Sequence, residues 1–522
     1  MTEFELKFAL DASAAAAFRH APALAGVRPT RRRLLNLYLD TPKAELARTQ
    51  MALRLRRAGG HWFQTLKAGN SGAGGIHARS EWEFARPGPR LDLSLFGGTP
   101  LAQIKDAGHL HERLATVFTV TFDRETWVVE SAPGSRIEVA LDRGEVSVAG
   151  RRDAICEVEL EVLEGESDAA FDLAHALLAT IALRPSTVTK AQRGWRLARG
   201  EGLAPAKAQR AALEDSMSPG AAAHATIAAG LAQLQANEEG VLASPDPEFV
   251  HQMRVALRRI RSSLGIFRDA LGPAFGPLAE ELHWIAGVLG AARDWDVLAT
   301  AVLPGLLADH GDAPLARRVR ALVAARRRHA RAVVHAAIRC ARYARLVLGL
   351  ARAIAEPAPS RPDDPPLVDF ASRILRKRHK RLLAHAQALA RFPVFLKSPH
   401  RDGDPSIERH ELRIAAKRLR YGVEGFAPLF RAKRVAAYVE TLSDIQDDLG
   451  QANDAANAGT LLGELALPGA FREYARGWLD AFTRAGCAGL EDHVARLADA
   501  RRFWRKAPKK PRPLAPPTVA IV

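Results

Sequence analysis

The first 200 residues contain a series of short segments in which charged and apolar side chains alternate. In the segment EFELK, Glu3, Glu5 and Lys7 alternate with Phe4 and Leu6. Successive side chains of a β-strand point to opposite faces, so this pattern predicts a strand with one charged face and one apolar face. Similar runs are LLNLYLD, MALRLRR, HWFQTLKA, SEWEFA, TVTFDRETWVVE, RIEVALD, GEVSVAG and ICEVELEVL. About eight such strands predict an antiparallel sheet or barrel.

For any single strand, a solvated sheet face explains the alternation equally well. The whole set is different, because its alternating positions are almost all full charges, grouped by strand into acids and bases. If the strands close into a barrel, these charges meet in the interior, where unpaired charges are costly. Clustered carboxylates favour a hard divalent cation, and clustered Arg and Lys favour phosphate. Together they indicate a site for a metal-bound polyphosphate.

A second constraint is an internal repeat in the helical part of the chain. HQMRVALRRIR begins at His251, and HELRIAAKRLR begins at His410. A second pair of motifs, LGAARDWD from Leu289 and LGQANDAA from Leu449, follows at nearly equal spacing. Two motifs repeated in the same order predict a duplicated helical bundle.

The change from alternating to helical periodicity near residue 200 predicts an α+β chain with two domains. The linker, residues 201–220, is either extended or contains a short helix that ends at Pro219-Gly220. The Pro-rich stretch EPAPSRPDDPP separates the two helical copies. The expected units are a β domain over 1–200, the linker over 201–220, helical copies over about 221–355 and 367–505, and a disordered, basic, Pro-rich tail over 506–522.

Each helical copy carries a stripe of basic side chains that begins with a histidine. The stripes consist of His251, Arg254, Arg258 and Arg261, and of His410, Arg413, Lys417 and Arg420, with Arg259 and Arg418 at their margins. A solvated helix face usually intersperses Glu with Lys or Arg, whereas neither stripe contains an acid. We therefore expect the stripes to bind an anion. The region has few aromatic residues to stack bases, which argues against nucleic acid.

The charge balance supports a polyanionic partner. The chain carries a net charge of +17, and residues 1–200 hold 27 Lys+Arg and 24 Asp+Glu, so most of the excess lies in the helical part. Arginine suits phosphate oxygens, although a GC-rich genome that writes Arg for Lys would also explain its abundance.

Other features of the sequence bear on its location. No run approaches the roughly 18 apolar residues of a membrane span, and no signal peptide is visible. The three widely spaced cysteines, Cys156, Cys340 and Cys487, argue against a disulfide framework or a zinc site. We therefore expect a cytoplasmic protein without a membrane partner.

The same residues carry a resemblance to known families. EFELK resembles the ExExK signature of CYTH-domain proteins, the triphosphate tunnel metalloenzymes. MALRLRR, the Lys of TLK, RSEWE, FDRETW, IEVALDRGEV, ICEVELEVL and STVTKAQRGWRLA follow in that family's order. The two histidine motifs, each followed by LGxxxD, resemble the CHAD domain over roughly residues 218–505. The combination is similar to bacterial inorganic triphosphatases that carry a CHAD domain.

The CYTH resemblance implies an eight-stranded antiparallel tunnel that binds triphosphate with Mg²⁺ or Mn²⁺. Glu5, Lys7 and Glu159 are the residues it implies for catalysis. The implied metal ligands are Glu3, Glu5, Glu157 and Glu159; the implied triphosphate ligands are Lys7, Arg54, Arg56, Lys67, Arg124 and Lys190. Glu81, Glu83 and Asp142 match further tunnel acids with open roles. Glu161 is either a fifth acid of the site or the rim end of its strand.

The leading hypothesis is metal-dependent hydrolysis of inorganic triphosphate in the tunnel. The CHAD resemblance implies that the basic stripes bind inorganic polyphosphate, which would associate the enzyme with polyphosphate granules. An adenylate cyclase or thiamine triphosphatase of the CYTH class is one alternative. A non-catalytic protein that only binds and targets polyphosphate is another.

Overall fold

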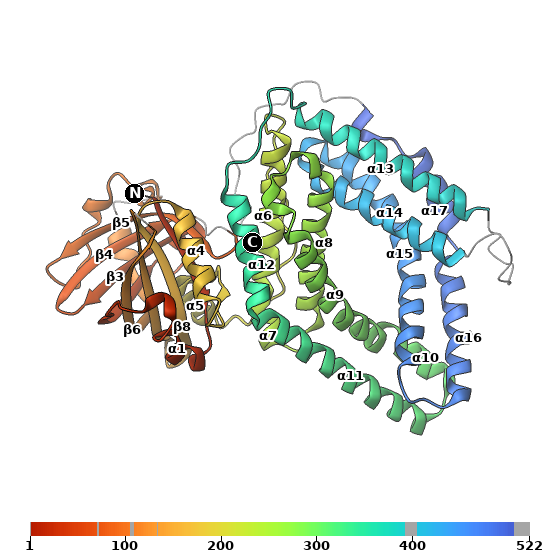
Figure 1. Ribbon diagram of the computed structural model, residues 1–522, viewed down its shortest axis with the longest axis horizontal. Coiled ribbons are helices and arrows are strands. Elements are labelled where there is room, and N and C mark those ends of the chain that lie inside the picture. Colours follow the sequence, from red (N-terminus) through yellow and green to blue (C-terminus); the bar gives the residue numbers. More distant parts are fainter. Residues whose placement is uncertain (1, 70–72, 105–108, 133, 392–404, 506–522) are drawn as a thin grey trace.

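The computed structural model describes residues 2–69, 73–104, 109–132, 134–391 and 405–505. A strand-rich domain lies beside a larger helical domain (Figure 1). The prediction of a two-domain α+β chain is confirmed. The tail predicted over 506–522 lies outside the described residues.

The strand-rich domain is a closed antiparallel sheet. Its strands run in the order β5-β4-β3-β2-β6-β7-β8-β1, and pairing of β5 with β1 closes the circuit. The sheet has nine strands where eight were predicted, because the two-residue β9 pairs with β1 outside that circuit. The strands are β1 (Thr2–Ala9), β2 (Thr30–Asp40), β3 (Met51–Ala58), β4 (His61–Ala68), β5 (Ile76–Arg86), β6 (Ala115–Ala132), β7 (Ser135–Val148), β8 (Arg151–Glu164) and β9 (Arg184–Pro185).

The alternation of residue types decides which side chains face the interior of the barrel. On β1, Leu6 and Phe8 are fully buried in an apolar cluster on the outer surface of the barrel. The ring of Phe4 packs 6.0 Å from that of Phe171 in a covering helix. Lys7, on the opposite face of the strand, points into the interior and is also buried. The helices of this domain are α1 (Ala12–Phe18), α2 (Glu45–Arg48), α3 (Leu110–Arg113), α4 (Ser167–Leu177) and α5 (Lys190–Arg199).

The helical domain follows the predicted duplication. The first histidine motif lies on α8 and its copy on α14, while the second motifs lie on α9 and α15. Helix α8 contacts α14, and α9 contacts α15, so the two copies meet through equivalent helices. The helices are α6 (Pro219–Ala236), α7 (Glu238–Ala243), α8 (Pro247–Ile266), α9 (Leu278–Val297), α10 (Leu303–His310), α11 (Ala313–Arg339), α12 (Ala341–Ala355), α13 (Leu367–Leu389), α14 (Pro405–Gly425), α15 (Ala432–Gly463), α16 (Gly469–Gly486) and α17 (Leu490–Asp499).

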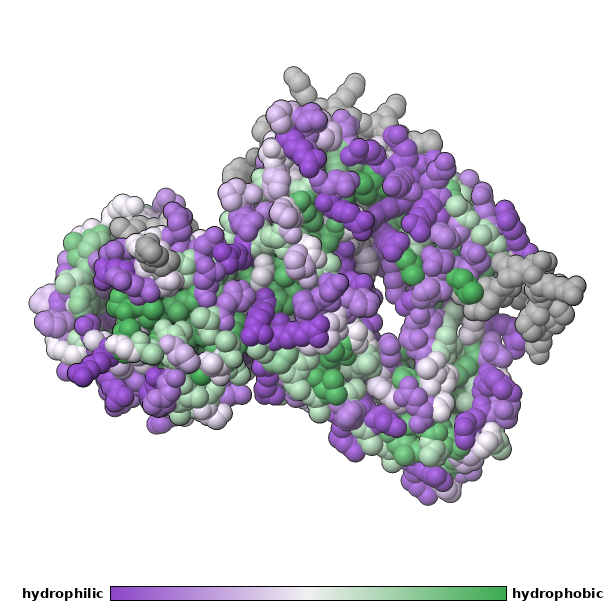
Figure 2. All heavy atoms as spheres, viewed as in Figure 1, coloured by the Kyte–Doolittle hydropathy of each residue, from purple (hydrophilic) through white to green (hydrophobic). Residues whose placement is uncertain are grey.

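The helical domain is open at its centre. In Figure 1, this region lies between α8 and α9 on one side and α15 on the other, and Figure 2 shows an opening through the molecule with mainly hydrophilic residues around much of its edge. Among the described helices, none combines the length and the apolar character that crossing a lipid bilayer requires.

The linker has no helix between the end of α5 and the start of α6. Pro219 opens α6, and the Ser218 side chain caps it by accepting a hydrogen bond from the Ala221 N–H. Proline suits this position because the first N–H groups of a helix have no partner within it. Pro219-Gly220 therefore begins a helix, and of the two predicted alternatives the structure has the linker, not the short helix that ends there.

Candidate functional site

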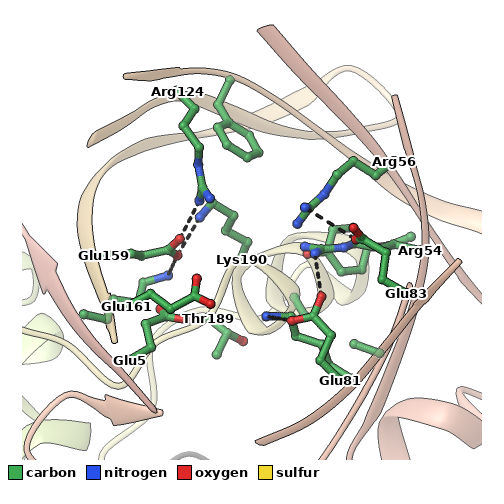
Figure 3. Close-up of a pocket in the computed structure, with 16 residues that line it drawn as sticks. Glu5, Arg54, Arg56, Glu81, Glu83, Arg124, Glu159, Glu161, Thr189 and Lys190 are labelled. Carbon is green, nitrogen blue, oxygen red and sulfur yellow. Dashed lines mark hydrogen bonds and ion pairs between the residues drawn. The ribbon is translucent and has the colours of Figure 1, made fainter. Parts of the chain in front are cut away.

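A cavity of about 280 Å³ occupies the interior of the barrel. Figure 3 shows acids and bases from opposite walls pointing into it, with the start of α5 behind them. The charged residues that line it are Glu5, Lys7, Arg54, Arg56, Lys67, Glu81, Glu83, Arg124, Glu159, Glu161 and Lys190.

Strand register pairs acids with bases on the first wall. Lys7 on β1 lies directly opposite Glu159 on β8. The Lys7 Nζ contacts Glu157 Oε1 at 2.7 Å and Glu159 Oε1 at 3.4 Å. Lys7 and Glu157 are almost fully buried, so each charge depends on the other.

Lys190 adds a second ammonium group to this wall. It is the first residue of α5, whose start is fixed by a capping box between Thr189 and Gln192. The Lys190 Nζ lies 2.6 Å from Asp142, 2.5 Å from Glu157 and 2.8 Å from Glu159. Burial would lower the pKa of Lys190, but the three carboxylates hold it well above its usual value.

Arg124 on β6 completes the wall. Its guanidinium donates two parallel hydrogen bonds of 2.7 Å to Asp142, which lies directly across the sheet on β7. It donates a third, of 2.5 Å, to Glu159. Carboxylate oxygens of Asp142, Glu157 and Glu159 lie within 4.8 Å of one another. Burial would raise the pKa of Glu159, but Lys190, Arg124 and Lys7 hold it well below its usual value.

The opposite wall repeats this pairing on β3, β4 and β5. Lys67 contacts Glu81 at 2.6 Å, and Arg54 contacts the same carboxylate at 3.4 Å. Arg56 lies 3.6 Å from Glu83. Burial lowers the pKa of Arg56 to about 10, and the neighbouring charge of Arg54 adds to this shift. The wall therefore presents three cations to the cavity.

Glu5 differs from the other cavity acids. Within the described part of the chain, its carboxylate accepts no hydrogen bond and makes no ion pair. Burial raises the pKa of Glu5 to about 7, and the negative charge of Glu159 adds to this rise. The positive charges of Lys67, Lys7 and Lys190 act in the opposite direction. Such a buried acid, beside a second carboxylate, fits a hard cation. Glu161 lies opposite Glu5 in the register and lines the cavity, as the first of its two expected roles requires.

Two predicted metal ligands stand apart from this arrangement. The side chain of Glu3 lies outside the described part of the structure. Glu157 does not line the cavity but lies beneath it, bonded to Lys7 and Lys190. Asp142, whose role the sequence left open, belongs to the same carboxylate cluster.

In the helical domain, part of the two predicted stripes forms a cationic cluster. The charges of Arg254 and Arg258 on α8 lie close enough to Arg413 and Lys417 on α14 to shift their titration. Burial, followed by Arg413, Arg258 and Arg254, lowers the pKa of Lys417 to about 7. The buried Nε atoms of Arg258 and Arg413 have no hydrogen-bond partner within the described residues. Among the described residues, none of these four cations donates a side-chain hydrogen bond or forms an ion pair.

His251 belongs to the same cluster, together with a residue that the sequence reasoning missed. Burial lowers the pKa of His251, and Arg293 is the largest charge acting on it. Arg293 lies within the LGAARDWD motif, directly before Asp294, which is the aspartate of the LGxxxD pattern. This position was the available signal in the sequence. Asp294 and Asp454 face the cluster, and burial raises the pKa of each.

Several stripe residues have other partners. Arg259 donates hydrogen bonds to Gln233 and to the linker carbonyl of Gln209. Arg420 bonds Glu424 and Gln446. Arg261 is exposed and lies beside His283. Arg418 and His410 are exposed as well, and the Arg418 carbonyl accepts a hydrogen bond from Arg378. Helical periodicity predicts that these residues share a face, but it does not show which neighbour each one meets.

Comparison with known proteins places both domains. A family model of the CYTH domain matches residues 1–195, and one of the CHAD domain matches residues 225–463. The chain is 30% identical over 164 residues to an inorganic triphosphatase of Haemophilus influenzae. This match covers 31% of this chain and 45% of that protein. The chain is 28% identical over 448 residues to an uncharacterized protein of Mycobacterium tuberculosis, covering 80% and 81% of the two chains.

Solved structures also match this chain. The CHAD domain of the plant Ricinus communis is 34% identical, with a TM-score of 0.47, and the match covers 57% of this chain and 98% of that one.

Proposed function

This chain belongs to the proteins that join a CYTH domain to a CHAD domain, and we propose that its tunnel hydrolyses inorganic triphosphate to pyrophosphate and phosphate. The observation that carries the proposal is the cavity inside the closed barrel, in which cations from two facing walls meet buried carboxylates. The Haemophilus relative, an inorganic triphosphatase, supports it, although the match spans less than half of that protein. The small volume favours a short phosphate chain.

The cations of both walls would hold the phosphate oxygens. Arg54, Arg56 and Lys67 act from one wall, and Lys7, Arg124 and Lys190 from the other. Fixed positive groups stabilise the charge that develops on phosphate oxygens during transfer. Their ion pairs with wall carboxylates hold them in place before substrate arrives.

The cavity acids would hold a divalent cation, Mg²⁺ or Mn²⁺. Glu5 and Glu159 face the cavity, Glu157 and Asp142 lie beneath it, and Glu3 stays a proposed ligand from the sequence. When bound, the cation supplies Lewis-acid polarisation of a phosphoryl oxygen. Glu5 or Glu159 would orient the attacking water by accepting its hydrogen bond.

The first test measures phosphate release by the full-length protein. The substrates are triphosphate, ATP and long-chain polyphosphate, each with Mg²⁺, with Mn²⁺ or with EDTA. We expect rapid release from triphosphate that EDTA abolishes. Cyclic AMP formed from ATP would instead indicate a cyclase, and preference for thiamine triphosphate would indicate that alternative activity. If no substrate is turned over, the remaining hypothesis is a non-catalytic protein that binds polyphosphate.

A substitution tests the site. Glu5→Gln keeps the size of the side chain but removes its charge, and we expect turnover to fall by about 10²–10⁴-fold. Glu130→Gln changes an exposed acid on the same barrel and should leave turnover unchanged. Wild-type turnover in Glu5→Gln would defeat the assignment.

A second function, polyphosphate binding by the helical domain, is favoured by the cationic cluster on α8 and α14. Repulsion among its buried cations is relieved when a polyanion binds, and a flexible chain of phosphates can contact both helices. The Arg254→Ala/Arg413→Ala double variant should lose retention on polyphosphate resin. Retention equal to that of the wild type would show that the chain binds elsewhere.

A further inference from the structure

The main chain of Lys7 is held by two segments that are distant from it in sequence. The Lys7 N–H donates to the carbonyl of Gly75 at 2.9 Å. The Lys7 carbonyl accepts from the Ser186 N–H at 2.8 Å. The position of the lysine side chain in the tunnel therefore depends on where the turn before β5 and the segment after β9 lie.

The turn before β5 fits only because it contains two glycines. Gly74 and Gly75 have φ values of +79° and +86°, which other residues rarely adopt. A Cβ atom on Gly75 would lie 2.9 Å from the Lys7 carbonyl oxygen, and one on Gly74 would lie 2.1 Å from the Cβ of Ala351. The turn is thus packed between β1 of the barrel and α12 of the helical domain.

One side chain of the helical domain bonds both segments. Gln235, near the end of α6, accepts a hydrogen bond of 2.6 Å from the Gly74 N–H. Its amide nitrogen donates to the carbonyl of Pro185 on β9 at 3.4 Å. Gln235 is 5% exposed, so losing these bonds would leave buried polar groups unsatisfied.

A neighbouring acid holds β9 as well. Glu238, at the start of α7, accepts hydrogen bonds of 2.9 Å from Arg184 and 2.6 Å from the Tyr343 hydroxyl on α12. Both residues of β9 are therefore bonded to the helical domain. Leu6 and Phe8 of β1 share one apolar cluster with Leu346 and Leu350 of α12. Figure 1 shows α12 beside the barrel, with α6 on the side of α12 that is farther from the barrel.

We propose that Gln235 is a positioning residue for the tunnel site, and that the helical domain completes the framework that sets Lys7 against its carboxylates. The inference rests on the proposed function, since Lys7 is one of its phosphate-binding residues. Gln235 bonds the main chain of Gly74 and of Pro185. The next residue after each of these, Gly75 and Ser186, bonds the main chain of Lys7.

The experiment compares two buried glutamines of α6 in the full-length protein. Gln235→Leu removes the bonds to the barrel. Gln233→Leu is the matched control, because Gln233 is 4% exposed and bonds Gln252 and Arg259 within the helical domain. We expect Gln235→Leu to lower kcat for triphosphate by about ten- to a hundredfold, because small displacements of positioning groups are costly in turnover. Gln233→Leu should leave kcat unchanged.

Hydrogen exchange provides a readout that does not depend on activity. In Gln235→Leu, the amides of Lys7 and Ser186 should exchange faster, while those between β6 and β7 keep their protection. Equal loss of kcat in both variants, or unchanged kcat and exchange in Gln235→Leu, would overturn the inference. If the wild type hydrolyses no triphosphate, faster exchange at Lys7 supports positioning by Gln235 while the proposed reaction fails.

Discussion

The tunnel and the helical cluster both gather cations, but they treat the charges differently. In the tunnel, Lys190 alone contacts three carboxylates. In the helical domain, Lys417 is surrounded mainly by Arg413, Arg258 and Arg254, with Asp454 as the opposing charge. Burial acts against both ammonium groups, yet the pKa of Lys190 is raised and that of Lys417 is lowered to about 7.

The difference indicates two ways of preparing for an anion. Paired cations are held in a defined geometry, which suits a reaction that requires precise placement. Unpaired cations repel one another until an anion arrives, so binding relieves unfavourable electrostatic energy without requiring one exact pose. The first arrangement suits catalysis on a short substrate, and the second suits retention of a long flexible polymer.

The largest expected effect comes from removing the paired ammonium group. Lys190→Met leaves Asp142, Glu157 and Glu159 buried with one cation fewer, and breaking a buried pair costs about 3–5 kcal/mol of unfolding free energy. Urea unfolding followed by far-UV circular dichroism measures this loss. Lys43→Met, at an exposed lysine of the same domain, is the control. A Lys190 variant as stable as the control would show that the wall tolerates free carboxylates.

Adjacent arginines on α8 sharpen the comparison within the helical domain. Arg258 faces the cluster, whereas Arg259 bonds Gln233 and the linker. We expect Arg258→Ala to weaken polyphosphate binding by about tenfold, which corresponds to about 1.4 kcal/mol. Arg259→Ala should bind normally and unfold at lower urea. Fluorescence titration with polyphosphate measures the affinities, and equal weakening in both variants would contradict the assignment.

The same Lys→Met change in the helical cluster should have the opposite effect on stability. Lys417 has a folded pKa of about 7, below its unfolded value, so its charge opposes folding as pH falls below the unfolded pKa. We expect Lys417→Met to stabilise the protein at pH 7 by on the order of 1 kcal/mol after allowance for screening, with the gain shrinking toward pH 10. Thermal unfolding at both pH values tests this; a destabilised variant at pH 7 would refute it.

The smallest effect is a pH dependence of polyphosphate affinity. A bound polyanion favours the charged form of Lys417, so binding takes up a proton when the solution is above pH 7. Affinity should therefore rise a few-fold as pH falls from about 9 to about 7. In Lys417→Met this rise should be smaller, although Arg413, Arg258, Arg254 and Asp454 remain around the site. The same slope in both proteins would exclude Lys417 as its source.

Alternation and repetition in the sequence were enough to predict the two-domain fold. The period-two charges of EFELK and ICEVELEVL predicted strands whose charged faces converge, and the repeated histidine motifs predicted paired bundles. These signals are local, and each follows from the geometry of one strand or one helix. The closing pair β1–β5 and the two-residue β9 carry no such periodic signal.

The site was harder to predict, because register and depth decide it. Glu157 and Glu159 look equivalent in the sequence, yet of the two only Glu159 lines the cavity. Glu157 lies beneath it and forms ion pairs with Lys7 and Lys190. Arg258 and Arg259 are neighbours in the motif but face different partners. Gln235 carries no motif, and its role depends on contacts across the domain boundary.

Closure of the barrel also has a consequence for the order of folding. The strand that carries Glu5 and Lys7 is made before its partners, because it pairs with β5 at Ser80 and with β8 at Glu161. Such distant partners require large loops to close, which slows folding. During synthesis these two residues therefore leave the ribosome before either partner strand exists. The cavity of the barrel therefore cannot close until β8 has been made.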